Sequence, residues 1–388
     1  MPDNEKKLLF GKTAVNMIYS VLNNAEAPEI SEDFDWESFR SFTKDHNISN
    51  IIYYAVRTMS GVPDEILKFY EETYLRACLK TALTDVEIPA LLDSFEENGV
   101  RHMPLKGYIM RNYYPDPAMR SMGDVDILVG SDLKEADKVI QSHGYSFHGE
   151  GFLHDNYVKK GLHIELHKSL VDEYFGTMYE YYGEGFGRAK TEPGYKYRYA
   201  FSDEDFYIFL LAHLAKHFKI AGTGIRSVMD IYVFRKKFPS LDDKYIDSQL
   251  SEIGLLKFKD KMEKMVFSWF SEPFTDDFDA VGEYIVTSGV YGQSDNHELN
   301  AFILNTLSDT SYKKGKIKYM LSMIFPGKKY LGARYPVVNK YPVLIPLYWI
   351  IRIFSTLTKS RYSIRYRLKG VSKSDEDSLK KFDDTGLR

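Results

Sequence analysis

Two aspartates placed two positions apart are the residues of this chain best suited to chemistry. Asp124 and Asp126 interrupt the apolar run GDVDILVG at residues 123–130. The flanking valine, isoleucine and leucine residues favour a β-strand, in which alternate side chains point to the same face. Two carboxylates about 6–7 Å apart on one face repel each other unless positive charge lies between them. A divalent metal ion, basic side chains or water at a strand end would each relieve that repulsion.

Glu165 is the third acidic candidate. It belongs to the segment LHIELH, residues 162–167, where apolar residues alternate with His163, Glu165 and His167. If this strand lies beside the first, three acids meet on one sheet face, which suits magnesium shared with phosphates. Without metal, their repulsion is expected to raise the pKa of at least one of them. The alternative is a pair of surface aspartates on a half-exposed strand.

The residues that precede the acidic strand carry positive charge. Lys106 follows a short apolar segment, Gly107 begins an expected helix, and Arg120 comes just before the strand. A glycine at a helix start lets a phosphate approach backbone N–H groups, and both cations can offset phosphate charge. Structural salt bridges between these cations and the aspartates fit the sequence equally well.

In two further pairs of polar residues, the two members lie four positions apart, about one helical turn. Arg226 and Asp230 are expected to form an ion pair, with Arg226 facing a nucleotide as the alternative. His213 and His217 have the spacing of zinc-binding histidines, but the glutamate of the H-E-x-x-H motif is missing. Packed or hydrogen-bonded histidines are therefore the simpler interpretation.

The elements that would position these residues follow from the periodicity of the chain. Residues 1–98 and 173–310 have the three- and four-residue apolar spacing of helices. Residues 99–172 contain short alternating segments separated by glycines, which indicates strands, the last three as an antiparallel meander. The sequence therefore predicts an α+β fold, with a small mixed β-sheet core flanked by helical N- and C-terminal regions.

Residues 311–370 differ from the rest in charge. They hold fourteen Lys or Arg and no acid, a charge of +14. Because the whole chain has a net charge of −4, the other residues together carry −18. The apolar stretch YPVLIPLYWIIRIF, residues 341–354, lies within them. Three interpretations remain open, namely packing on the acidic remainder, an amphipathic surface on anionic lipid, and binding of RNA or DNA phosphates. Residues 371–388 are expected to form a polar, disordered tail.

The composition narrows the class of protein. The 388 residues are 44% hydrophobic and 15% aromatic, which is typical of a folded chain. The single cysteine, Cys78, leaves no partner for an internal disulfide and excludes a metal site with several cysteines. The N-terminus lacks the apolar core of a signal peptide, and no run reaches the ~20 apolar residues of a membrane span. We expect a cytoplasmic protein, with peripheral attachment to the inner membrane surface through residues 311–370 as an alternative.

This arrangement resembles the nucleotidyltransferase superfamily that includes DNA polymerase β, and within it a bacterial branch of nucleotidyltransferase family proteins. The branch carries Leu-Lys-Gly, a Tyr-Pro loop, an arginine and an Asp-x-Asp strand. The matching positions here are residues 105–107, 114–115, Arg120 and 124–129. The likeness covers about residues 85–170 and, more weakly, 213–234. Tyr108 stands where the superfamily often has a serine that contacts phosphate.

The resemblance implies metal-dependent transfer of a nucleoside monophosphate from an NTP to an unknown acceptor, which would be a small molecule, a protein or RNA. It implies Mg²⁺ or Mn²⁺ held by Asp124, Asp126 and Glu165, which would also be the catalytic residues. The expected nucleotide and phosphate contacts are Lys106, Gly107, Arg120 and Arg226. Two other classes stay open, a non-catalytic interaction protein on this fold and a module that tethers membrane or RNA through residues 311–370.

Overall fold

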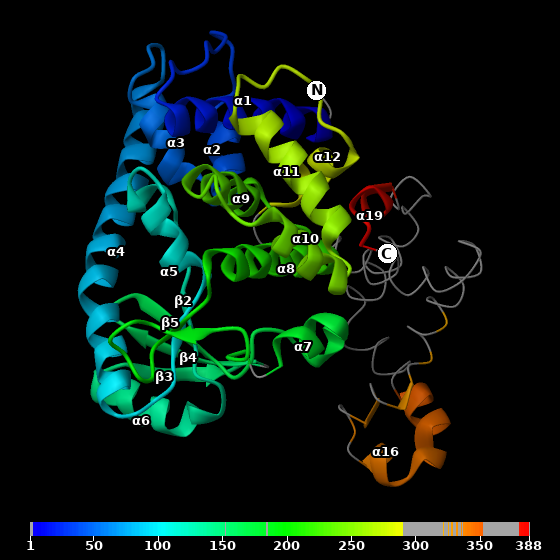
Figure 1. Cartoon of the computed structure of the whole chain (residues 1–388). Helices are drawn as coiled ribbons and strands as arrows, with labels where there is room; N and C mark the ends of the chain where they lie inside the picture. Colours follow the sequence, from blue (N-terminus) through cyan, green and yellow to red (C-terminus); the bar gives the residue numbers. More distant parts are fainter. Residues whose placement is uncertain are drawn as a thin grey trace.

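The computed structural model describes residues 3–151, 153–183 and 185–289, short pieces between 321 and 351, and residues 380–387. In this part of the chain, helices surround one five-stranded sheet, and two short strands form a separate ribbon (Figure 1). The prediction of an α+β fold with a small mixed sheet between helical regions is confirmed.

The N-terminal region is helical, as its periodicity predicts. Its fourth helix, α4, is 34 residues long and runs along one edge of the molecule, from the other helices to the sheet (Figure 1). It ends at Glu97, and Gly99, two residues later, adopts a positive φ of 71° that glycine accepts without strain. The four helices are α1 (Asp3–Asn23), α2 (Trp36–Asp45), α3 (Ser49–Val56) and α4 (Asp64–Glu97).

The five-stranded sheet has the order β1-β2-β5-β4-β3. Strands β2 and β5 are parallel, and every other pair of neighbours in this sheet is antiparallel. The three strands predicted as an antiparallel meander pair in that way. The strands are β1 (Met103–Pro104), β2 (Val125–Leu128), β3 (Ser146–Glu150), β4 (His154–Lys159) and β5 (Leu162–His167).

The two faces of this sheet have different chemistry. On one face Val125, Ile127 and Ile164 join a buried apolar cluster with the C-terminal half of α4 and with α6 (Leu133–Ser142). Side chains alternate along a strand, so Asp126 and Glu165 project from the opposite face. The sheet is therefore anchored on one side and presents its acids on the other.

The helices that follow the sheet form a second, larger core with α1–α3. The first long one, α8, begins at a cap that the sequence predicts, because the Ser202 hydroxyl accepts a hydrogen bond from the backbone N–H of Asp205 at 3.1 Å. Besides α5 (Lys106–Met110), which lies between β1 and β2, the elements that follow the sheet are α7 (Thr177–Tyr182), β6 (Lys190–Thr191), β7 (Tyr199–Ala200), α8 (Asp203–Ile220), α9 (Ile225–Lys237), α10 (Asp243–Glu252), α11 (Leu256–Phe270) and α12 (Ala280–Ser288).

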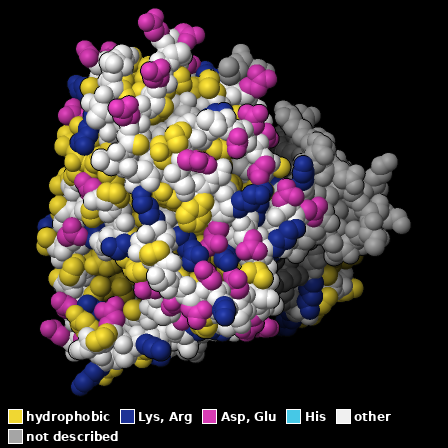
Figure 2. Space-filling model, turned by 45° about the horizontal axis from the view of Figure 1, so that its top comes forward, with side chains coloured by type: hydrophobic (Ala, Val, Ile, Leu, Met, Phe, Trp, Pro, Cys, Tyr) yellow, Lys and Arg dark blue, Asp and Glu magenta, His cyan; other side chains and the backbone are white. Residues whose placement is uncertain are grey.

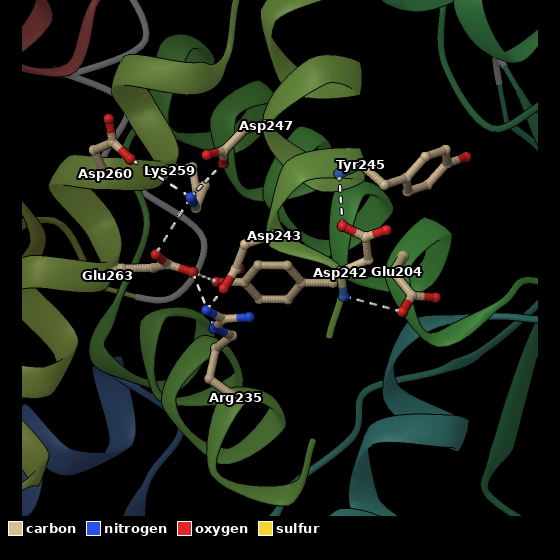
Figure 3. A network of polar contacts seen from close by, with 10 residues as sticks. Glu204, Arg235, Asp242, Asp243, Tyr245, Asp247, Lys259, Asp260 and Glu263 are labelled. Atoms are coloured by element: carbon tan, nitrogen blue, oxygen red, sulfur yellow. Dashed lines mark hydrogen bonds and ion pairs between the residues drawn. The ribbon is translucent and has the colours of Figure 1, made fainter. Parts of the chain in front are cut away.

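A network of charged side chains joins α9, α10 and α11 (Figure 3). The Lys259 ammonium lies 2.5 Å from Asp247 and 3.7 Å from Glu263. The Arg235 guanidinium lies 2.9 Å from Asp243 and 3.2 Å from Glu263. These contacts tie three helices together at the side of the helical core.

The prediction of a disordered tail is wrong for residues 380–387. Lys380–Thr385 form helix α19, and Phe382 is fully buried with its ring 5.9 Å from that of Phe218. Phe382 and Leu387 both join the larger core, and burying each such side chain is worth about 1.5–3 kcal/mol, which favours docking of this segment.

Most of the basic region 311–370 lies outside the described residues, so its three interpretations stay open. The described part includes α16 (Val337–Lys340), and the side chains of Val343 and Ile350 are 83% and 53% exposed. None of the described helices combines the length and apolar character of a membrane span. On the face shown in Figure 2, acidic and basic side chains are interspersed with hydrophobic ones.

Candidate functional site

The two aspartates stand at the start of β2, next to the third acid. Asp126 and Glu165 are register partners in the parallel pair β2–β5, as the convergence of the acids requires. The loop before Asp124 is held by Lys80 of α4, which donates hydrogen bonds to the backbone carbonyls of Met122 and Gly123, both at 2.8 Å. The middle of α4 and a parallel strand thus fix the acidic edge of the sheet.

A cavity of about 500 Å³ opens between this sheet face and helices α8 and α9. Its size falls within the range of ligand pockets, which is about 300–1,000 Å³. The structure brings every residue that the sequence singles out for the site to the wall of this one cavity. They are Lys106, Gly107, Arg120, Asp124, Asp126, Glu165 and Arg226.

Asp126 already has two hydrogen-bond donors as partners. The Lys106 ammonium lies 3.0 Å from its Oδ1, and Nε2 of His167 donates to the same oxygen at 2.7 Å. Burial opposes ionisation of this carboxyl, but the Lys106 charge and the His167 hydrogen bond outweigh it and hold the pKa of Asp126 well below its usual range. The same contacts with carboxylates raise the pKa of His167 despite its burial.

Asp124 is in the opposite situation. Burial, followed by the negative charges of Asp126 and Glu165, raises the pKa of Asp124 above that of an ordinary aspartate. The repulsion expected from the sequence therefore raises the pKa of Asp124, whereas at Asp126 the contacts with Lys106 and His167 outweigh it. Of the two aspartates, Asp124 is the one whose ionised form still lacks compensating charge.

Arg120 binds a carboxylate that the sequence assigns to another partner. Its Nε and Nη2 donate to the two oxygens of Asp230 at 2.9 and 2.7 Å, and the buried Tyr114 hydroxyl donates to Asp230 at 2.8 Å. Arg226, expected as the partner of Asp230, donates from Nη1 to the carbonyl of Ser121 at 3.1 Å. Arg120 is thus held at the cavity wall by α9.

Gly107 leaves room for this arginine. A Cβ atom at Gly107 would lie 2.5 Å from Nη1 of Arg120. The helix that the sequence begins at Gly107 begins instead at Lys106, whose φ of +40° is unusual for a residue with a side chain. The structure therefore supplies a packing reason for this glycine besides the phosphate contact expected from the sequence.

Helix α8 contributes three polar cavity residues, of which the sequence marks His213 and His217 but not Lys216. Lys216 lies on the wall, and burial followed by the nearby Lys106 charge lowers its pKa. His213 and His217 also line the cavity, with their Nε2 atoms 3.0 Å apart, as hydrogen-bonded histidines. The four-residue spacing of the histidines is visible in the sequence, but the face of α8 that meets the cavity is set by tertiary packing.

His154, at the start of β4, is another cavity residue that the sequence does not single out. It pairs in register with His167 on β5, and its Nε2 lies 3.3 Å from Glu165. Only the antiparallel alignment of β4 and β5 places it there, so no local sequence signal identifies it.

Comparison with known proteins agrees with this geometry. A family model described as uncharacterised nucleotidyltransferase matches residues 32–271, which include the whole sheet and helices α8 and α9. No curated protein and no solved structure matches the chain. Because the family model spans more than half of the 388 residues, this chain belongs to that nucleotidyltransferase family.

Proposed function

We propose that this protein is a metal-dependent enzyme that transfers a nucleoside monophosphate from an NTP to an acceptor. The proposal rests on one observation, the convergence of Asp124, Asp126 and Glu165 at one edge of a cavity that is also lined by several lysine and arginine side chains. Membership of a nucleotidyltransferase family supports transfer of a nucleotidyl group. The NTP, the metal and the acceptor are the proposed parts.

The donor set fits magnesium or manganese. Both are hard cations that prefer carboxylate oxygens and share them with substrate phosphates. The raised pKa of Asp124 supports this assignment, because a half-buried carboxylate without full compensation gains most from a bound cation. Bound there, the ion supplies positive charge to the triphosphate and to the attacking oxygen.

The side chains of the chain have separate roles in this proposal. Asp124 and Asp126 hold the metal against the triphosphate, and Glu165 faces the side from which the acceptor approaches. Lys216 and Arg226 offset phosphate charge from the helical wall, while Lys106 keeps Asp126 ionised. Phosphoryl transfer needs little more from a protein than such positioning and charge neutralisation.

The test is binding and turnover of the full chain with each labelled NTP, in the presence of Mg²⁺ or Mn²⁺ and a cell extract as the source of acceptor. We expect a labelled product that disappears with Asp124→Asn. The matched control is Asp155→Asn, an acid on β4 whose side chain alternates away from the cavity and binds Lys168 at 3.2 Å. Equal activity in both variants, or no NTP binding with either metal, would refute the proposal.

A further inference from the structure

Two histidines and a glutamate converge at the side of the cavity beyond Asp126. His154, Glu165 and His167 can each direct one ligand atom into a group whose members all lie within 4.8 Å of one another. Within this group, Nε2 of His154 lies 3.3 Å from Oε1 of Glu165, and Nε2 of His167 lies 3.3 Å from Oε2.

These two separations, which involve different oxygens of Glu165, are close to those between neighbouring donor atoms around a small metal ion, and the group as a whole, which lies within 4.8 Å, would contract around a bound ion. With metal–ligand bonds of about 2.0–2.1 Å, two donors of a tetrahedral site stand about 3.3 Å apart. Two imidazoles and one carboxylate form a known ligand set of catalytic zinc and of other transition metals. Magnesium instead favours oxygen donors and keeps much of its water.

The site is built on rigid elements and remains open on one side. His154 and His167 are directly opposed in the antiparallel pair β4–β5, and Glu165 precedes His167 by two residues on the same strand face. His167 is buried, whereas the side chains of His154 and Glu165 are 27% and 19% exposed at the cavity. A bound ion would therefore keep a free position that faces the cavity.

We infer that His154, Glu165 and His167 form a binding site for a first-row transition metal ion, such as Zn²⁺ or Mn²⁺, in preference to Mg²⁺. This site would give the metal position next to Glu165 a ligand set that contains nitrogen. Any catalytic role of the site rests on the proposed function. Metal binding itself needs neither nucleotide nor acceptor. The contacts of His167 with Asp126 and Glu165 would be exchanged for bonds to the metal, with release of its proton.

Cobalt is the probe, because Co²⁺ takes the same ligands as Zn²⁺ and its visible absorption is much stronger in a four- or five-coordinate protein site than in the octahedral aqua ion. The full chain, stripped with a chelator, is titrated with Co²⁺ without nucleotide. We expect one Co²⁺ per chain, displaced by an equimolar amount of Zn²⁺ and retained against a hundredfold excess of Mg²⁺. Displacement by Mg²⁺, or the absence of cobalt absorption, would overturn the inference.

Three histidine variants locate the site. His154→Gln and His167→Gln are expected to weaken Co²⁺ binding at least tenfold, while His163→Gln, an exposed histidine of the same strand β5, binds as the parent does. His154 is partly exposed, so its variant tests the inference even if loss of the buried His167 impairs folding. Unchanged Co²⁺ affinity in His154→Gln would show that the cluster is only a set of hydrogen bonds.

Failure of this inference is separable from failure of the proposed function. Asp124→Asn should abolish NTP binding and keep the Co²⁺ spectrum, since Asp124 is not one of the three ligands. A protein that binds Co²⁺ but no NTP would contradict the proposed function and leave the metal site intact. If the protein binds NTP with Mg²⁺ but gives no Co²⁺ spectrum, the metal site is contradicted and the proposed function stands.

Discussion

The acidic edge of the sheet and the charged network of α9–α11 both bring several carboxylates close to two cations, but they differ in access to water. In the network the side chains of Asp243, Asp247 and Asp260 are 55%, 43% and 64% exposed. At the sheet edge Asp126 is 10% exposed and its partner His167 is 9% exposed. Solvent can complete the charge balance of the network, whereas the sheet edge depends on protein groups and on whatever enters the cavity.

This difference assigns different roles to similar chemistry. A surface network stabilises a fold modestly, because screened charges gain little and ordered side chains lose entropy. A largely buried cluster with one uncompensated carboxylate lowers the stability of the fold. Such a cluster is typical of a functional site, where a bound ligand supplies the missing positive charge. The comparison predicts that charge removal affects activity at the sheet edge and stability in the network.

Asp124→Asn should have the largest effect on activity. Turnover of NTP should fall about 10³-fold or more, since the variant loses a metal ligand and a transition-state charge contact. The Tm without metal should be unchanged or higher, because the raised pKa of Asp124 means that its ionised form costs stability. That gain should vanish as the pH falls toward about 4, where an unfolded aspartate is also protonated. A lower Tm with normal turnover would reverse the assignment of this carboxylate.

Lys259→Met should show the opposite pattern. The variant leaves Asp247, Asp260 and Glu263 without their shared cation. We expect a loss of about 1–3 kcal/mol in the free energy of unfolding, toward the lower end because two of these acids are largely exposed. Turnover per folded molecule should stay at the parent value. Denaturant unfolding and an activity assay on the same sample measure both quantities, and a loss of turnover would mean that the network communicates with the cavity.

Lys216→Ala tests whether helix α8 contacts the triphosphate. NTP affinity should fall about tenfold, the effect of losing one charge-assisted hydrogen bond of about 1.5–3 kcal/mol. Stability should not fall, because burial already disfavours the charged form of this lysine. Lys219→Ala is the matched control, on the same helix with a pKa also lowered by burial. Titration calorimetry should separate the two variants, and equal affinities would exclude Lys216 from the phosphate site.

The sequence predicts much of the sheet edge because its signals are local. The Asp-x-Asp strand and the alternation of LHIELH fix which side chains share a face, and the parallel register then pairs Asp126 with Glu165. The opposite behaviour of the two aspartates is beyond such reasoning. It depends on Lys106 and His167 reaching Asp126 across the fold.

Partners that come from distant segments are the part that the sequence does not predict. The spacing of Arg226 and Asp230 suggests an ion pair within one helix, yet Asp230 binds Arg120, which is 110 positions away. The docking of α19 likewise depends on a pocket for Phe382 that is built by other helices. Helical periodicity identifies each element but not the neighbour that its polar face meets.

A pair of buried tyrosines gives the finest test of the comparison. The Tyr114 hydroxyl donates to Asp230 at the cavity at 2.8 Å, and the Tyr207 hydroxyl donates to Glu263 in the network at 2.7 Å. Removing either hydroxyl as Tyr→Phe deletes one hydrogen bond to a carboxylate that is also bound by an arginine. Each variant should therefore lose a similar free energy of unfolding, about 1 kcal/mol.

The two variants should differ in nucleotide binding. Asp230 orients Arg120 toward Gly107 and the cavity, so Tyr114→Phe loosens a residue that the sequence predicts as a phosphate contact. The KM for NTP should rise about two- to threefold with kcat nearly unchanged, because the contact is weakened and not removed. Tyr207→Phe changes only the network and should leave both constants at the parent values. If the KM stays constant in both variants while stability falls equally, the Arg120–Asp230 pair is as purely structural as the Arg235–Glu263 pair. Phosphate contact at the acidic edge would then fall to Lys216 of α8 and Arg226 of α9.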